Sequence, residues 1–259
     1  MGCQMNVLDS ELVLGQLCAL GYKPTGEPGR ADLVLLNTCS VRQHAEDKVY
    51  SRLGEIGRAR QGKPDMIVGV IGCMAERDPE AIRRRVPFVQ ILCGPGNLHE
   101  LPDLIRQVRE SGEQAVALEH DHSRKAPNYA RTLEHDAIES LDLSRTVVPG
   151  GSVLQSYVRV QRGCDKFCSY CVVPFTRGPE RSRPPANVLA EARRLADLGA
   201  REITLLGQTV NSYACSENGH VVRLSDLLAR VHAVDGIERI RFVTSYPGDF
   251  TDDILYAMR

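Results

Sequence analysis

The amino-terminal part of the chain alternates short apolar runs with helical stretches, and this alternation restricts the possible folds more than any other feature. The runs are nearly continuous in apolar residues, as is typical of strands that are covered on both faces of a sheet. They occupy residues 32–37, 65–71, 88–92 and 114–118. The helical stretches lie at 9–20, 43–60, 76–86 and 97–110. This order predicts an α/β fold with a doubly wound parallel sheet.

A second series of the same kind follows after residue 151. Its expected strands lie at 156–161, 202–207 and 239–245, and its expected helices at 186–198 and 224–234, with another helix starting at 251. A parallel sheet of so few strands cannot close into a barrel, because its edges stay unpaired and one face stays uncovered. We therefore expect the first part of a (β/α) partial barrel, truncated within a longer protein.

A polar segment of mixed charge separates the two series. It covers residues 119–151 and ends in Pro-Gly-Gly, so we interpret it as a linker with a helical turn near 136–141. The predicted domains are therefore 1–118 and 152–259. Three linker histidines are candidate ligands, although solvated side chains are the expected interpretation. They are His120, His122 and His135.

The composition narrows the class of protein. The chain is 42% hydrophobic and 25% charged, as is ordinary for a soluble globular protein. Its 32 basic and 33 acidic residues do not by themselves indicate a nucleic-acid partner. No apolar run reaches the roughly 18 residues of a membrane span, and the amino terminus lacks a signal-peptide pattern. We expect a cytoplasmic chain without a membrane anchor, in which nine cysteines serve as ligands or thiols rather than disulfides.

Three cysteines form a CxxxCxxC pattern after the first strand of the second series. They are Cys164, Cys168 and Cys171, and Tyr170 precedes the last of them. Three thiolates can hold three irons of a cubic cluster and leave the fourth iron open to another ligand. A structural zinc site would need four donors, and no fourth cysteine or histidine lies nearby. The pattern therefore predicts an iron–sulfur site.

Three further cysteines belong to the first series. Cys39 and Cys73 follow the strands at 32–37 and 65–71, and Cys3 stands where a preceding strand would end. Because the carboxyl ends of parallel strands converge at one edge, these thiols can meet in space. The residues alone leave two readings open, namely a second metal site and separate core cysteines.

The remaining cysteines have less definite roles. Cys93 also ends an expected strand, where a buried apolar position is favoured over a ligand. Cys18 is expected in the core beside its helix neighbours. Cys215 is expected to be a free thiol, and the sequence assigns it no role.

Four cysteine blocks resemble the methylthiotransferase branch of the radical-SAM enzymes, and within it the MiaB type. The blocks are GCQMN (2–6), NTCSVR (37–42), GCMAER (72–77) and RGCDKFCSYCVVPFTRGPERSRP (162–184), and LLGQTVNSY (205–213) and FVTSYPGDF (242–250) fit the same pattern. The resemblance extends from Met1 to Arg259. In this family the barrel continues and usually ends in a TRAM domain, so we expect a fragment that lacks both and turns over poorly.

The resemblance implies two 4Fe–4S clusters and S-adenosylmethionine as cofactors. The CxxxCxxC cysteines would hold the cluster that cleaves S-adenosylmethionine to a 5′-deoxyadenosyl radical. The three cysteines of the first series would hold an auxiliary cluster. The implied reaction adds sulfur and a methyl group at carbon 2 of N6-isopentenyl-adenosine, next to the anticodon of tRNA. It requires a reducing electron donor and a sulfur donor, which the sequence does not identify.

Five further residues are expected at the cofactor site. A parallel barrel builds its site at the carboxyl ends of its strands, which favours residues just after the second and third strands of this series. Arg177 is expected to contact substrate or cofactor. The full set is Tyr170, Arg177, Gly207, Gln208 and Ser245.

Three alternatives remain at this point. A sister methylthiotransferase would act on threonylcarbamoyl-adenosine in tRNA or on an aspartate of a ribosomal protein. A non-catalytic iron–sulfur scaffold or electron-transfer module would bind clusters without cleaving S-adenosylmethionine. A zinc-binding module would contain zinc instead of iron.

Overall fold

The computed structural model describes residues 2–40, 43–119, 137–145 and 154–259. Its amino-terminal half contains a parallel sheet whose strands are neighbours in sequence order, β1-β2-β3-β4. The strands are β1 (Leu33–Thr38), β2 (Ile67–Gly72), β3 (Ile91–Cys93) and β4 (Ala115–Ala117). The predicted α/β class and the four predicted strands of this half are confirmed.

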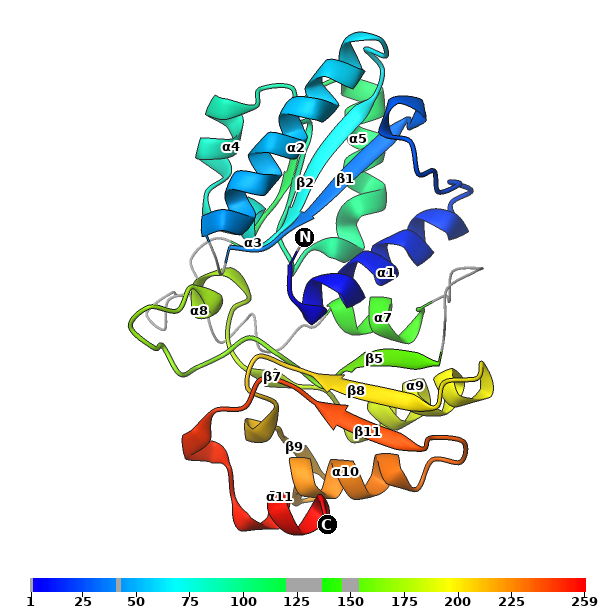
Figure 1. The fold of residues 1–259 in the computed structure, drawn as a ribbon, viewed down its shortest axis with the longest axis vertical. Helices are drawn as coiled ribbons and strands as arrows, with labels where there is room; N and C mark the ends of the chain where they lie inside the picture. The colour runs from blue at the N-terminus through cyan, green and yellow to red at the C-terminus, as the bar shows by residue number, and fades with distance from the viewer. Residues whose placement is uncertain (1, 41–42, 120–136, 146–153) are drawn as a thin grey trace.

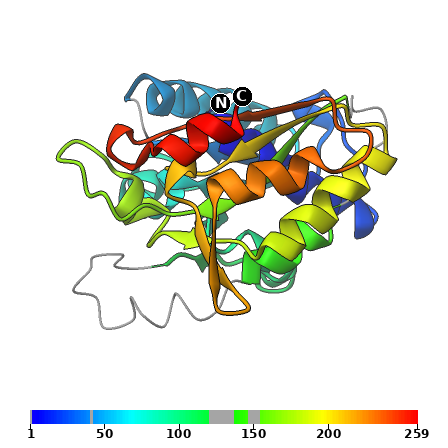
Figure 2. The same ribbon diagram turned by 90° about the horizontal axis from the view of Figure 1, so that it is seen from below.

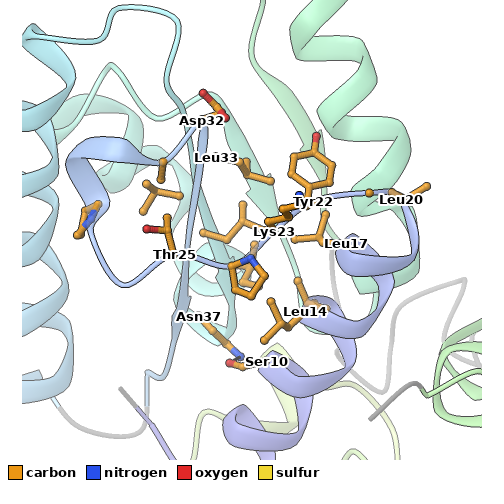
Figure 3. A pocket seen from close by; sticks show the side chains of 18 of the residues that line it. Ser10, Leu14, Leu17, Leu20, Tyr22, Lys23, Thr25, Asp32, Leu33 and Asn37 are labelled. Carbon is orange, nitrogen blue, oxygen red and sulfur yellow. Dashed lines mark hydrogen bonds between the residues drawn. The ribbon is translucent and has the colours of Figure 1, made fainter. Parts of the chain in front are cut away.

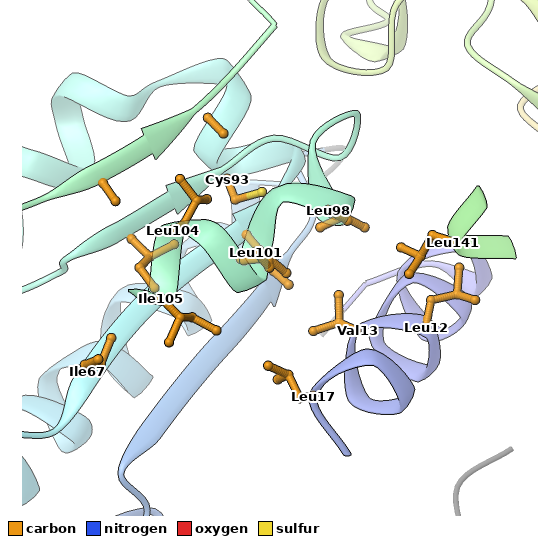
Figure 4. Close-up of a cluster of buried hydrophobic side chains, with 14 of the residues drawn as sticks. Leu12, Val13, Leu17, Ile67, Cys93, Leu98, Leu101, Leu104, Ile105 and Leu141 are labelled. Atoms are coloured by element: carbon orange, nitrogen blue, oxygen red, sulfur yellow. The ribbon is translucent and has the colours of Figure 1, made fainter. Parts of the chain in front are cut away.

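Helices cover both faces of this sheet, which is why its strands are apolar on both sides (Figure 1). One face carries α1 (Gln4–Ala19) and α5 (Leu101–Ser111), and the other carries α2 (Gln43–Gln61) and α4 (Pro79–Arg85). Short 3₁₀ turns lie at Pro28–Arg30 and Leu98–Glu100. Figure 4 shows how leucines of α1 and α5 meet in the core beside Cys93.

Two details of this half differ from the sequence-based expectation. The helix predicted at 76–86 is split into α3 (Cys73–Arg77) and α4, because Asp78 leaves the helical conformation. The Asp78 side chain accepts a hydrogen bond from the Ala81 amide (3.0 Å) and so caps α4. Cys18 was expected in the core and is only half-buried, so that prediction was wrong. The prediction of a buried Cys93 is confirmed.

The second half contains a parallel sheet in the order β11-β8-β5. Its strands are β5 (Gln155–Arg159), β8 (Glu202–Leu206) and β11 (Arg239–Phe242). Figure 2 shows the helices of this half on the face that points away from the first sheet. They are α9 (Pro185–Asp197), α10 (Leu224–His232) and α11 (Asp252–Ala257). The predicted partial barrel is confirmed as a fold class.

Short elements lie in the connections between the strands and helices of this half. β6 (Gln161–Arg162) pairs antiparallel with β7 (Arg181–Ser182), and 3₁₀ turns lie at Val210–Ser212 and Pro247–Asp249. A hairpin of β9 (Ala214–Glu217) and β10 (His220–Arg223) was missed in the sequence. Its turn is Asn218-Gly219, both with positive φ, which is the typical signal of a two-residue hairpin.

The predicted helical turn in the linker is confirmed as α7 (Ala137–Leu143). Together with α1 it lies between the two sheets (Figure 1). The linker histidines His120, His122 and His135 lie outside the described residues. In the described part of the chain, no helix combines the length and the apolar character that a membrane crossing requires.

Candidate iron–sulfur sites

The first group of cysteines gathers at the carboxyl edge of the four-stranded sheet. Cys39 follows β1, Cys73 begins α3 directly after β2, and Cys3 precedes α1. The Cys3 thiol forms a side-chain hydrogen bond with Cys39. Cys3 and Cys73 also share an electrostatic partner, the guanidinium of Arg177. The tertiary structure thus places Cys3 beside Cys39, and places Cys3 and Cys73 beside the same guanidinium, although these residues are far apart in the sequence.

Polar residues next to these cysteines hold the three segments in place. The Asn6 amide group donates to Asn37 Oδ1 (2.8 Å) and to the Thr38 carbonyl (2.9 Å). Thr38 Oγ1 in turn donates to the Ile71 carbonyl (2.7 Å). Gly72 has φ +88°, and a Cβ there would lie 2.7 Å from the Thr38 carbonyl oxygen. Sequence reasoning did not assign these residues a role, although each lies one to three positions from a cysteine of its block.

The surroundings of the Cys3 thiol lower its pKa and so favour the thiolate. Its hydrogen bond with Cys39 and the positive charge of Arg177 lower its pKa from 9.0 to about 5, although burial opposes the shift. The Asn6 and Met5 backbones contribute in the same direction. Because the thiolate is the form that binds metals, this position is a ready ligand at neutral pH.

The second group lies in the loop between β6 and α8 (Val173–Thr176). The Cys164 amide donates to the Gly178 carbonyl (3.1 Å), and the Cys171 amide donates to the Cys168 carbonyl (2.9 Å). Gly163 has φ +69°, and a Cβ there would lie 1.9 Å from the Pro179 carbonyl oxygen. Only glycine allows the loop to close this tightly on the returning chain.

Glu180 lies beside this loop and was not singled out in the sequence. It accepts hydrogen bonds from Thr209 Oγ1 (2.9 Å) and Ser212 Oγ (2.8 Å). Burial raises the pKa of Glu180. Burial also raises the pKa of Cys164, and the nearby Glu180 carboxylate adds to that rise. Metal binding at Cys164 would therefore release a proton.

The residues expected at the cofactor site are brought together only in part. Gly207 and Gln208 follow β8, and Ser245 follows β11. These two strand ends are adjacent, because Thr244 Oγ1 donates to the Gly207 carbonyl (2.6 Å). Tyr170 is 92% exposed on the cysteine loop. Contact of these residues with S-adenosylmethionine stays a prediction.

Arg177 lies elsewhere. Its Nη2 donates to Asp9 Oδ2 (3.0 Å) on α1, so its side chain reaches toward the first group of cysteines. A cofactor contact for Arg177 therefore stays a prediction, and its observed neighbours point to another role.

Both cysteine groups offer the type of donor, thiol sulfur, that a cubic iron–sulfur cluster requires. Within the described residues, no three His, Cys, Asp or Glu side chains are arranged as a site for a single metal ion. A structural zinc site would need four donors, whereas three thiolates could hold three irons of a cubic cluster. Each group supplies three thiols and no mixed donors, which fits the cluster.

Two cavities lie near these elements. One of about 830 Å³ opens between α1, the following loop and the edge strand β1, and Leu14, Leu17 and Tyr22 line it (Figure 3). None of its lining residues is a cysteine. A smaller one of about 300 Å³ is lined by Lys166 of the cysteine loop and by Asp249, which form an ion pair. The smaller cavity is the one that adjoins the second group.

A buried ionic network joins the two halves through β5, α1 and α7. Arg159 of β5 is fully buried and donates to Asp9 Oδ1 of α1 (3.0 Å) and to both carboxylate oxygens of Asp142 of α7 (2.6 and 2.9 Å). Burial opposes the charged form of Asp142, but Arg159 and Arg183 hold its pKa below the ordinary value. Asp9 thus receives one guanidinium on each carboxylate oxygen, from Arg159 and from Arg177.

The network extends along α7 and α9. Arg183 donates to Glu191 (2.7 Å) and to both oxygens of Glu139 (2.7 and 2.9 Å). Arg145 donates to Glu11 of α1 (2.5 Å) and to the Tyr157 carbonyl (2.5 Å). These contacts set the position of the amino-terminal half on the barrel sheet.

Comparisons with known proteins agree with this architecture. Residues 1–94 match the family described as "Uncharacterized protein family UPF0004", and residues 158–259 match the "Radical SAM superfamily". A solved radical S-adenosylmethionine methyltransferase, TsrM from Kitasatospora setae, superposes with a TM-score of 0.54 at 18% identity, over 95% of this chain and 48% of its own. At that identity the likeness shows the fold alone. The chain therefore combines an amino-terminal region that matches the UPF0004 family with a carboxyl-terminal region that matches the radical-SAM superfamily.

Curated relatives refine this class. Proteins named tRNA-2-methylthio-N(6)-dimethylallyladenosine synthase are 46% identical in Rhodopirellula baltica and 42% identical in Syntrophotalea carbinolica. The matches cover 100% and 98% of this chain, and 53% and 54% of the relatives. The chain therefore spans about half the length of the curated relatives it matches. Its resemblance to the methylthiotransferases is confirmed.

Proposed function

We propose that the chain is part of a radical-SAM methylthiotransferase that inserts sulfur and a methyl group at carbon 2 of N6-isopentenyl-adenosine in tRNA. The observation that carries this proposal is the presence of three cysteines at the carboxyl edge of the first sheet and three in the loop after β6, one group from each half. The names of the curated relatives support the substrate. The partners are tRNA that contains isopentenyl-adenosine, a reducing electron donor and a sulfur donor, in the cytoplasm.

The residues that would hold the cofactors follow from the two groups. Cys164, Cys168 and Cys171 would hold the cluster that binds S-adenosylmethionine, and the first group would hold the auxiliary cluster. When bound, these cofactors supply reductive cleavage of S-adenosylmethionine to a carbon radical, and sulfur for transfer. The carboxyl ends of β8 and β11, with Gly207, Gln208 and Ser245, would line the S-adenosylmethionine site, with Tyr170 at its mouth.

The chain's own residues prepare the site for this chemistry. The tight turn at Gly163 brings the start of the cysteine loop against the returning chain at Gly178 and Pro179. Glu180 is held by Thr209 and Ser212 with a raised pKa, so it can accept or retain a proton near Cys164. The ionic network holds α1 against β5 and α7, because its charges are buried and paired.

Iron content tests the two-cluster proposal. After anaerobic reconstitution, the chain is expected to contain about eight irons, because two cubic clusters hold about four each. Changing Cys3 and Cys73 to Ala should reduce this to about four, measured by iron and sulfide analysis. The matched control is Cys215→Ala, whose thiol lies in the hairpin away from both groups. About four irons in the unchanged chain would contradict the proposal, and zinc in place of iron would indicate a zinc-binding module.

The substrate is tested in a strain that lacks the gene for this protein. Mass spectrometry of tRNA nucleosides should show loss of methylthio-isopentenyl-adenosine and accumulation of isopentenyl-adenosine. The methylthio form of threonylcarbamoyl-adenosine should be unchanged. The full-length gene should restore the modification, whereas the gene with Cys164→Ala should not. Unaltered methylthio-isopentenyl-adenosine in the deletion strain would rule out this substrate.

A further inference from the structure

The Arg177 guanidinium belongs to one half of the chain but lies at the cysteines of the other half. Arg177 ends α8, and its amide donates to the Val173 carbonyl (2.8 Å). Its side chain is only 7% exposed, and Nη2 lies 3.0 Å from Asp9 Oδ2 on α1. Helix α8 packs against α3, which begins with Cys73. A permanent positive charge of the radical-SAM half is thus buried against the UPF0004 half.

Asp9 neutralises this charge only in part. Its other carboxylate oxygen accepts from Arg159 (3.0 Å), so one carboxylate serves two guanidinium groups. The remaining electrostatic partners of Arg177 include the thiols of Cys73 and Cys3. The guanidinium therefore acts as a counter-charge for sulfur atoms as well as for Asp9.

A charge at this position has a definite effect on a bound cluster. Three thiolates give the auxiliary site excess negative charge, and reduction adds one more electron. A nearby cation favours the reduced form, and the effect is strong because the surroundings are buried and poorly screened. Net charge and hydrogen bonds at the sulfur atoms are among the features that set the potential of iron–sulfur clusters.

We propose that Arg177 is a positioning residue of the auxiliary site. Asp9 holds the Arg177 guanidinium against Cys3 and Cys73, and the charge of Arg177 raises the reduction potential of their cluster. This inference rests on the proposed function, since it requires an auxiliary cluster. It also means that the site of the UPF0004 half is complete only when the radical-SAM half is docked on it.

The test isolates the auxiliary cluster. In a chain with Cys164, Cys168 and Cys171 changed to Ala, only the auxiliary cluster remains, and dithionite supplies the electron in a titration followed by electron paramagnetic resonance. Arg177→Gln is expected to lower the one-electron equilibrium constant for reduction about tenfold, which corresponds to about 59 mV toward more negative potential. Arg177→Lys keeps the charge and should recover most of that difference.

Arg193→Gln is the matched control, because Arg193 is exposed on α9 of the same half. It should leave the potential unchanged. Equal potentials for Arg177→Gln and Arg193→Gln would overturn the inference. So would equal shifts for the Gln and Lys variants of Arg177, since a purely structural role does not depend on charge.

Two further outcomes separate this inference from the proposed function. The chain that lacks the CxxxCxxC cysteines should still bind about four irons. If it binds none, the auxiliary cluster itself is contradicted. If Arg177→Gln fails to fold, the double variant Asp9→Asn/Arg177→Gln is compared with Asp9→Asn alone, because the two differ only in the charge of Arg177. A more negative potential in the double variant supports the inference, and equal potentials overturn it.

Discussion

Replacing Arg159 by Met is expected to destabilise the chain by about 3–5 kcal/mol, because it leaves buried carboxylates without their main partner. Asp9 and Asp142 are each about 1% exposed and both accept hydrogen bonds from Arg159. A loss of this size is a large share of the roughly 5–15 kcal/mol that stabilises a typical protein. The thermal midpoint, measured by circular dichroism, should fall by on the order of 10 °C.

The same substitution at an exposed ion pair provides the control. Arg52 pairs with Glu55 on the surface of α2, and both side chains are about half exposed. Arg52→Met is expected to cost less than about 1 kcal/mol. Adding Asp142→Asn to Arg159→Met should restore part of the stability, because it removes an unpaired buried charge. Similar losses for Arg159→Met and Arg52→Met would show that the network does not hold the halves together.

Replacing Gly163 by Ala should abolish the cluster of the CxxxCxxC loop. The new Cβ would lie 1.9 Å from the Pro179 carbonyl oxygen and 2.5 Å from that of Gly178, and neither backbone atom can move without opening the loop. The positive φ adds strain of about 1–3 kcal/mol. We expect about four irons per chain instead of about eight, and a fall in S-adenosylmethionine cleavage of at least about tenfold.

Gly21→Ala is the control for this second change. Gly21 also has a positive φ, of +89°, but a Cβ there would meet no atom within 4 Å. It shares the backbone strain of Gly163→Ala and lacks the collision. Iron content and S-adenosylmethionine cleavage should therefore stay near those of the unchanged chain. Equal losses in the two variants would mean that the tight closure of the loop is not what presents its cysteines.

Most strands were predictable because their signal is local. A run such as Ile67–Gly72 is apolar throughout, and the structure buries it on both faces. Boundaries were less predictable, since they depend on single contacts. The break between α3 and α4 follows from one side chain, Asp78, that caps the second helix. The hairpin at Asn218-Gly219 was not predicted, although Asn-Gly is a recognisable signal of a two-residue turn.

The cysteine groups were predictable for a different reason. The CxxxCxxC spacing places three thiols in one loop whatever the rest of the chain does. The other group, with Cys3, Cys39 and Cys73, could be inferred only because parallel strands end at a common edge. The residues that support these thiols, such as Asn6 and Gly163, carry no pattern of their own. Their roles depend on which backbone atoms the fold brings next to them.

The alternation of apolar runs and helices, and the three thiols of the CxxxCxxC loop, were determined by the sequence itself, because both depend on residues close together in the chain. Only the tertiary structure decided how the two halves meet. Asp9 and Arg159 are 150 residues apart, and Asp9 and Arg177 are 168 apart. Such pairs form only when α1 docks on the barrel sheet, and burial there excludes water and makes each charge depend on its partner.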